Sequence, residues 1–400
     1  MSGPATAASR QETMRIMLVS DQYEPMVGGV PTVTRELAYG LAERGHSVAL
    51  VVPSPARRGR HSADGQVSVT YRGSLGWPWY DGMRLGCLPA ATARKLIASF
   101  APDVAHIHSP VTLGVTARNG ARRQRVPVVY TNHYLPANVR PATTPTSRVL
   151  DGVFYRHVVG FSNRCSYVTA PTATALGLLR DRGLRVPSRV MSNGVDLRAY
   201  SPGPADGRLR QRYGLPAGRL VILSVGRLSP EKRLDVLLDA ASRLGGDAQV
   251  ALAGAGPEEA ALRARAQRLG LGARVRFLGF VPESDLPGLY RLADVFAITS
   301  EAELQSLTTM EAMATGLPVV AVDACALREL VRHGDNGFLA RPGRATEVAA
   351  HLDLLCADPA ERARMSAASR RIISGHERTR WLAEWESLYR ELATAGTGAR

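Results

Sequence analysis

Residues 300–318, SEAELQSLTTMEAMATGLP, contain the pattern that predicts the fold and the site of this chain. A strand-like run at 294–299 leads into them, and a helix-like run follows until a glycine and a proline end it. Glu303 lies in the turn before the predicted helix, and Glu311 lies about two turns into it. At a rise of about 1.5 Å per residue, the two glutamates are roughly 12 Å apart.

The start of this helix predicts a phosphate site, because the first N–H groups of a helix lack partners within it and attract anions. The residues that would offer these groups lie between the two glutamates: Leu304, Gln305, Ser306, Leu307 and Thr308. One carboxylate at each end of a phosphate seat suits a ligand with a sugar on one side and a ribose on the other. That ligand is a nucleotide sugar.

Two glutamates at this spacing also occur on ordinary solvated helix faces. Here, however, Glu311 is surrounded in the sequence by Met310, Ala312, Met313 and Ala314. A carboxylate among apolar or small residues needs a partner. This setting favours a functional pair of glutamates.

The length of 400 residues suggests two domains, and 45% hydrophobic residues is typical of a globular protein. No apolar run is long enough to span a bilayer. Residues 1–13 are predicted to form a disordered tail, since they lack the apolar core of a signal peptide. The four cysteines are scattered without metal-type pairing, which favours a reduced, cytoplasmic protein.

The formal net charge is +15, and most of it comes from arginine, with clusters at 57–60 and 118–125. No nucleic-acid motif accompanies these clusters, so we predict no nucleic-acid partner. An anionic membrane surface and an acidic, phosphate-bearing substrate both fit this charge. So does a genome that favours arginine codons, together with a solvated surface.

Strand-like and helix-like runs alternate along the chain, which predicts two doubly wound, Rossmann-like α/β domains with parallel sheets. Residues 14–198 would form an acceptor domain and residues 199–375 a nucleotide-sugar domain, with a turn-rich linker near 200–207. A helix within 376–400 is expected to cross back to the first domain. The predicted strands are 15–19, 47–52, 104–107, 126–130, 167–169, 189–191, 220–225, 248–252, 275–278, 295–298 and 319–322.

Because ligands in such folds bind at the carboxyl ends of the strands, the site is expected in the cleft between the domains. Gly28 and Gly29 follow the first strand and allow close approach to the backbone. Arg227 and Lys232 follow the first strand of the second domain, where they would neutralise a diphosphate. A short glycine turn at 254–256 is interpreted as a tight turn near the donor pocket.

His133 also follows a predicted strand and would contact the transferred sugar. His106 and His108 share one face of another strand, but a third metal ligand is not evident. No pair of aspartates is separated by one residue anywhere in the chain. This absence fits charge neutralisation by side chains and a helix start, so no metal and no cofactor are predicted.

Several motifs together resemble the retaining family-4 glycosyltransferases of the GT-B fold, over about residues 14–392. The residues that carry the resemblance are Gly28-Gly29-Val30, Ser192-Asn193-Gly194-Val195-Asp196, Gly226-Arg227-Leu228 with Lys232, and Glu303 with Glu311 and the three residues that follow it. The stretch 130–139, YTNHYLPANV, is most similar to members that glycosylate lipids such as diacylglycerol. The chain departs from the family at Ser306, where a glycine is usual.

The resemblance implies that Arg227 and Lys232 hold the donor diphosphate. It further implies that Glu303 binds hydroxyls of the donor sugar and that Glu311 binds the ribose. Gly28 and Gly29 would lie against the diphosphate or the acceptor, with His133 beside the sugar. Asn193 and Val281 are included among the predicted donor contacts, the latter from a loop near the base.

We therefore expect transfer of a hexose from a UDP- or GDP-sugar to an acceptor hydroxyl, with retention and without metal. A membrane glycolipid precursor is the expected acceptor, because basic clusters and the aromatic run 77–80 suit a membrane interface on its cytoplasmic side. The same chemistry on a soluble cyclitol, sugar or secondary metabolite is an alternative. A sugar-nucleotide epimerase, a phosphorylase or a non-catalytic binder remains open as another class. A dehydrogenase is disfavoured, because the first turn lacks the dinucleotide fingerprint.

Overall fold

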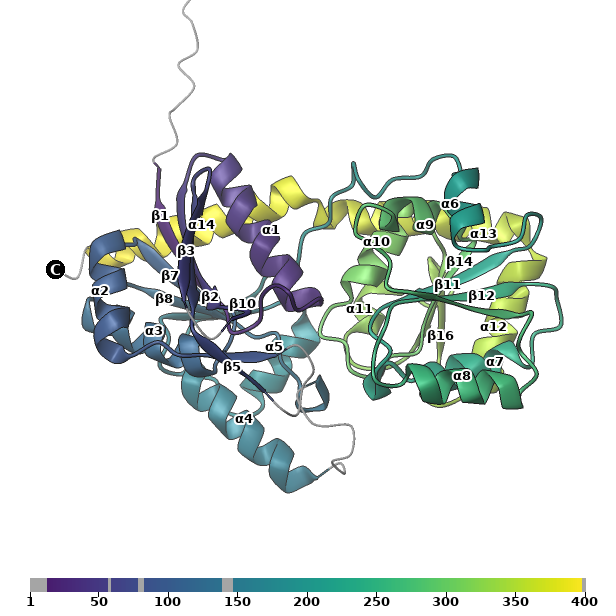
Figure 1. The fold of residues 1–400 in the computed structure, drawn as a ribbon, viewed down its shortest axis with the longest axis horizontal. Coiled ribbons are helices and arrows are strands. Elements are labelled where there is room, and N and C mark those ends of the chain that lie inside the picture. Colours follow the sequence, from purple (N-terminus) through teal and green to yellow (C-terminus); the bar gives the residue numbers. More distant parts are fainter. Residues whose placement is uncertain (1–12, 57–58, 78–82, 139–146, 398–400) are drawn as a thin grey trace, which may run out of the picture.

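The computed structural model describes residues 13–56, 59–77, 83–138 and 147–397. The chain forms two lobes, each an α/β domain with a central sheet (Figure 1). The predicted tail, the arginines at 57–58 and most of the aromatic run 77–80 lie outside the described residues. The last residue of the 130–139 stretch lies outside them as well.

The sheet of the first domain has eight described strands and is parallel except at one edge. Its interior strands are almost wholly apolar, as expected when helices cover both faces. In spatial order the strands are β10 (Ser188–Val190), β9 (Tyr167–Ala170), β8 (Val128–Thr131), β7 (Val104–Ile107), β1 (Arg15–Val19), β2 (Ser47–Pro53), β4 (Val67–Arg72) and β3 (Arg60–Asp64).

The antiparallel edge is a departure from the predicted parallel pattern. β3 pairs antiparallel with β4, and a separate hairpin joins β5 (Ser74–Gly76) to β6 (Arg84–Gly86). β3, β5 and β6 were missed because they are short and mostly polar. β4 was missed as well, because its apolar residues alternate with polar ones. Without a continuous apolar run, the sequence does not distinguish an edge strand from a loop.

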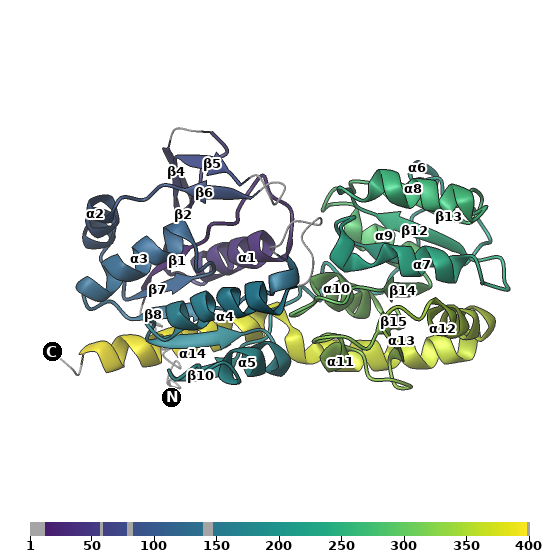
Figure 2. The ribbon, with the colours of Figure 1, turned by 90° about the horizontal axis from the view of Figure 1, so that it is seen from below.

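Helices cover both faces of this sheet (Figure 2). Successive residues of β1 point to opposite sides, so Ile16 and Leu18 enter one core and Met17 and Val19 enter the other. The first core also contains α1 (Gly29–Glu43) and α14 (Arg378–Thr397). The second contains α2 (Ala90–Phe100), α3 (Thr112–Arg123), α4 (Arg148–Ser162) and the end of α5 (Ala173–Arg180).

The second domain has a six-stranded parallel sheet within the described residues. The order is β13 (Val275–Gly279), β12 (Gln249–Ala253), β11 (Val221–Val225), β14 (Val295–Ile298), β15 (Val319–Val322) and β16 (Gly337–Ala340). One face carries α7 (Leu234–Ala241), α8 (Glu259–Arg268), α12 (Ala345–Ala357) and part of α13 (Pro359–Ile373). The other carries α9 (Leu286–Leu292), α10 (Leu307–Thr315) and α11 (Leu327–Leu330), and the short α6 (Gly207–Arg212) packs against α9. β16 was not predicted from the sequence.

The chain passes between the domains twice, and the two passages are joined. Val195 and Glu377 form a parallel bridge, in which the N–H of Val195 donates to the His376 carbonyl at 2.9 Å. Beyond this point α14 enters the core of the first domain, with Trp381, Trp385 and Tyr389 all buried. The helix thus returns across the first sheet, as the yellow ribbon in Figure 1 shows.

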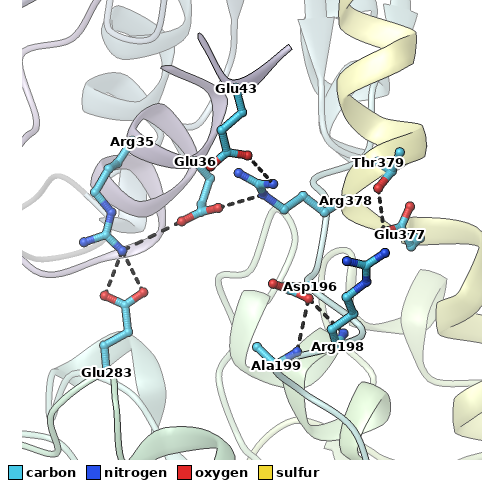
Figure 3. A network of polar contacts seen from close by, with 10 residues as sticks. All are labelled: Arg35, Glu36, Glu43, Asp196, Arg198, Ala199, Glu283, Glu377, Arg378 and Thr379. Carbon is cyan, nitrogen blue, oxygen red and sulfur yellow. Dashed lines mark hydrogen bonds and ion pairs between the residues drawn. The ribbon is translucent and has the colours of Figure 1, made fainter. Parts of the chain in front are cut away.

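Ion pairs on α1 hold the region around the two passages together (Figure 3). Arg378 binds Glu36 at 3.1 Å and Glu43 at 2.9 Å. Arg35 donates to both carboxylate oxygens of Glu283 in the second domain, at 2.6 and 2.7 Å. One helix of the first domain is therefore tied both to the returning helix and to the opposite domain.

Candidate active site

The predicted phosphate-binding site lies at the start of α10. Ser306 is the residue before the helix, and its hydroxyl accepts a hydrogen bond from the N–H of Thr309 at 3.2 Å. The serine that replaces the usual glycine thus caps the helix. Gly316 ends α10 in a left-handed conformation, with φ 89°.

The carboxylate before this helix is paired with a cation from the other predicted motif. Lys232 Nζ donates to Glu303 Oε1 at 2.6 Å, and Glu303 is buried. Lys232 ends a short 3-10 helix, η2 (Pro230–Lys232), just beyond β11. Two groups that are 71 positions apart in the sequence therefore meet in one ion pair.

Arg227 and Lys232 line one pocket at the carboxyl ends of β11 and β14, together with Gly226, Thr299 and Ser300. Glycines allow the backbone to pack closely here. Gly226 and Gly254 have φ angles of 152° and 141°, and a Cβ at Gly254 would lie 1.9 Å from the Gly226 carbonyl oxygen. The turn at 254–256 thus supports the loop that carries the two cations.

Residues of the first domain also contact the start of α10. A Cβ added to Gly29 would lie 3.9 Å from Leu307 Cδ1, so the start of α1 lies against the first turn of α10. Ala302 and Leu304, which flank Glu303, are packed with residues of the first domain that include Leu135. The Leu304 carbonyl also accepts a hydrogen bond from the Thr172 hydroxyl at 2.8 Å. The start of α10 therefore lies where the two domains meet.

Glu311 has the hydrogen-bond partners that a buried carboxylate needs. The buried Tyr290 hydroxyl donates to Glu311 Oε2 at 2.8 Å, and Tyr200 bonds the same carboxyl. Burial raises the pKa of Glu311 to about 7, an effect that these two hydrogen bonds oppose. The carboxyl is thus poised to change charge near neutral pH.

If Glu311 accepts ribose hydroxyls, donor affinity should weaken about tenfold between pH 8 and pH 6, because the protonated carboxyl loses its acceptor strength. The direction follows from a raised pKa: the neutral form prevails below about pH 7, and the ionised form above it. Calorimetric titration of a nucleotide across this range would measure the effect. Glu311→Gln should flatten the profile, whereas Glu301→Gln, on the same segment, should preserve it.

His133 is half-buried and lies in the loop directly after β8. Asn132 shapes this loop, since its Oδ1 accepts hydrogen bonds from the Tyr130 hydroxyl and from the N–H of Tyr134. Leu135 packs against the residues that flank Glu303, which brings the loop to the start of α10. His133 Nε2 lies 3.0 Å from His108 Nδ1, a contact that the sequence did not predict.

Two of the predicted donor contacts, Asn193 and Gln305, are bonded to each other. Gln305 Oε1 accepts the N–H of Asn193 at 2.7 Å, and Gln305 Nε2 donates to Ser192 Oγ at 2.8 Å. Ser192 Oγ also bonds His376 Nδ1, which lies on the second passage between the domains. These side chains connect α10 to the interdomain crossing. A link of this kind depends on contacts across more than 100 positions and has no local sequence signal.

Other predicted residues lie in different settings. Val281 is buried in the core of the second domain, so only its backbone could meet a base, and Thr308 is half-buried in the first turn of α10. Arg118 was counted with the basic cluster, and this interpretation was wrong. It is 4% exposed, its guanidinium lies 4.4 Å from the centre of the Phe161 ring, and it donates hydrogen bonds to the Asn119 side chain, so it packs inside the domain.

The sequence analysis also missed Asp21. Its buried carboxylate accepts hydrogen bonds from the hydroxyls of Ser109 and Thr112 and from the N–H of Leu113 at the start of α3. Burial raises the pKa of Asp21 against the effect of these bonds. Asp21 thus joins the end of β1 to the start of α3. A single aspartate after a strand does not predict this role from the sequence.

Comparison with known proteins identifies the class. Residues 27–199 match the family model "Glycosyltransferase Family 4", and residues 206–372 match "Glycosyl transferases group 1". The chain is 31% identical to a D-inositol 3-phosphate glycosyltransferase of Mycobacterium bovis, over 92% of this chain and 82% of that protein. It is 28% identical to an alpha-monoglucosyldiacylglycerol synthase of Streptococcus pneumoniae, over 77% and 71%.

The structure of Anabaena Alr3699/HepE in complex with UDP and glucose superposes with a TM-score of 0.76 and 25% identity, covering 94% of this chain and 99% of that one. The two facing α/β domains therefore have the GT-B fold. The chain belongs to the family-4, group 1 glycosyltransferases, enzymes that use nucleotide sugars, and its resemblance to lipid-type members is confirmed. Among its described helices, none is both long and apolar enough to cross a bilayer.

Proposed function

We propose that this protein is a retaining hexosyltransferase that moves a sugar from a UDP- or GDP-sugar to a hydroxyl of a membrane glycolipid precursor. The observation that carries the proposal is the Lys232–Glu303 pair at the start of α10, where both domains meet. It provides a cation for the departing diphosphate and a carboxylate for sugar hydroxyls within one hydrogen bond of each other.

In the proposed reaction, the diphosphate binds the N–H groups at the start of α10 and the cations of the neighbouring pocket. Lys232 and Arg227 stabilise the charge that develops as the bond between sugar and diphosphate breaks. Glu303 accepts hydrogen bonds from the sugar and orients it, and Glu311 holds the ribose. The acceptor attacks on the side from which the diphosphate departs, and a phosphate oxygen takes its proton, so the configuration is retained. Because Lys232, Arg227 and the N–H groups of α10 neutralise the negative charge of the diphosphate, we propose that no metal is required.

The lipid acceptor is supported by a projecting apolar surface on the first domain. Val149, Leu150 and Val153 at the start of α4 are 75%, 48% and 58% exposed, and we call them the α4 tip. Exposed Arg148 and Arg156 lie on the same helix. Apolar side chains next to cations suit an anionic bilayer surface. The streptococcal relative is named for a diacylglycerol product, in line with this acceptor.

The proposal is tested by nucleotide release from UDP-, GDP- and ADP-sugars, with and without a detergent-dispersed lipid extract. Release that depends on one donor and rises with lipid is expected. Release that is unaffected by lipid but rises with a soluble cyclitol or sugar would contradict the lipid acceptor. Release or interconversion of the donor without any acceptor would indicate hydrolysis or epimerisation, and no turnover at all would leave only a sugar-nucleotide binder.

Replacing the α4 tip by Val149→Ser with Val153→Ser should weaken sedimentation with anionic vesicles at low salt by about tenfold, because two apolar side chains no longer enter the interface. Nucleotide release with a soluble acceptor analogue should change little. The matched control is Leu269→Ser with Leu354→Ser, which alters two exposed apolar residues of the second domain. Equal vesicle binding by both double variants would rule out the tip as the contact.

A further inference from the structure

Three histidines form a cluster near the carboxyl ends of two neighbouring strands of the first domain. His106 belongs to β7, His108 follows that strand, and His133 follows its parallel neighbour β8. The centres of the His106 and His108 rings are 4.1 Å apart, and those of the His108 and His133 rings are 5.2 Å apart with 14° between the ring planes. His106 and His108 are fully buried, whereas His133 is half-buried.

Both nitrogens of His106 are bonded to hydroxyl groups. Its Nδ1 lies 2.6 Å from the Tyr389 hydroxyl, and its Nε2 lies 2.7 Å from Thr131 Oγ1. A hydroxyl donates or accepts by rotating, so this environment is compatible with either tautomer of His106. His106 therefore joins the strands to α14 without selecting a proton position.

The contact between His108 and His133 is more restrictive. It joins two ring nitrogens at 3.0 Å, so one must carry a proton and the other must not. His108 Nε2, on the other side of its ring, is buried and has no partner among the described residues. A buried N–H without an acceptor is rarer in folded proteins than an acceptor without a donor. This asymmetry places the single proton of His108 on Nδ1, where it donates to His133 Nε2.

The proton of neutral His133 must then lie on Nδ1, the nitrogen away from His108. Burial lowers the pKa of His133 to about 4 and the pKa of His108 well below its usual value, so both rings are neutral at pH 7. No described residue bonds His133 Nδ1. The ring therefore offers one N–H donor and no positive charge.

We propose that His108 is a positioning residue that sets the tautomer of His133, so that His133 presents an N–H donor to a hydroxyl of the donor sugar. This inference rests on the proposed function, in which His133 lies beside the sugar. A hydroxyl that accepts from His133 keeps its own O–H free to donate to a carboxylate such as Glu303. The opposite tautomer would place two acceptors around the sugar and lose this complementarity.

The tautomer can be measured without donor or turnover, by ¹⁵N–¹H correlation of histidine side chains in the protein labelled at histidine. His133 is expected to show a protonated Nδ1 and an unprotonated Nε2, with its signals assigned by their loss in His133→Asn. A protonated Nε2 would overturn the inference. Because no ligand is present, this outcome is separate from any failure of the transferase proposal.

Kinetics provide the second test. His108→Leu removes the donor to His133 and should lower kcat about tenfold, the equivalent of one hydrogen bond, with a smaller change in KM for the nucleotide sugar. His108→Asn keeps an amide near the Nδ1 position and should restore most of the rate. His106→Asn is the matched control for disturbance of the cluster. If His108→Leu kept the wild-type kcat, or if His108→Asn and His108→Leu were equally slow at equal thermal stability, the positioning role would be wrong.

Discussion

Lys232→Ala should lower kcat by about two to three orders of magnitude, because the departing diphosphate loses the cation that meets its developing charge. Thermal stability should fall as well, since the buried Glu303 carboxylate would be left without its 2.6 Å partner. The measurement is nucleotide release under single-turnover conditions, together with a thermal melt. Single turnover separates the chemical step from product release.

Two further variants separate loss of charge from loss of folding. Arg233→Ala alters the next residue, whose guanidinium binds Asp235 and Glu301. This variant loses only partly exposed ion pairs, so its thermal stability and its kcat should both change little. Lys232→Met with Glu303→Gln removes both charges, so it should melt closer to the wild type than Lys232→Ala while remaining inactive. If Lys232→Ala kept a kcat near that of the wild type, the diphosphate would bind elsewhere.

Trp385→Ala should lower the free energy of unfolding by about 3–5 kcal/mol, because it empties a large site in the core between α14 and the first sheet. The side chain is 2% exposed, and its ring lies 4.5 Å from His106 and 5.5 Å from Tyr389. Urea unfolding followed by circular dichroism would measure the change. The loss should be confined to the transition that reports the first domain.

Trp385→Phe is the matched variant for this site. Trp385 Nε1 has no hydrogen-bond partner among the described residues, so phenylalanine removes volume without stranding a bonding group. Trp385→Phe should lower the free energy of unfolding clearly less than Trp385→Ala does. If alanine instead left unfolding unchanged and abolished vesicle binding, the aromatics of α14 would be membrane anchors and not core.

The strands that the sequence located are those whose signal is local. β1, β11 and β14 are continuous apolar runs bounded by turn residues, and each was placed to within about one residue. The strand–turn–helix pattern at 294–318 likewise predicted α10 and its glycine end. The strands β3, β4, β5 and β6 were missed, because a strand that is half exposed need not be a continuous apolar run.

The candidate site was predictable only in part. The residue types after β11 and before α10 predicted a cation and a carboxylate at strand ends, but not that Lys232 and Glu303 would bond each other. Gln305 and Asn193 were both predicted as donor contacts, and the sequence did not predict that they also bond each other across the interdomain crossing. Arg118 was assigned to a basic surface and is buried.

The sequence by itself determined the alternation of strands and helices, the two-domain organisation and the positions of the charged loops. These features depend on residues that are neighbours along the chain. Only the tertiary structure decided the Lys232–Glu303 pair, the tyrosines that surround Glu311 and the contact between His108 and His133. Each depends on side chains that parallel strands and packed helices bring together from distant positions, and no local pattern encodes which of them meet.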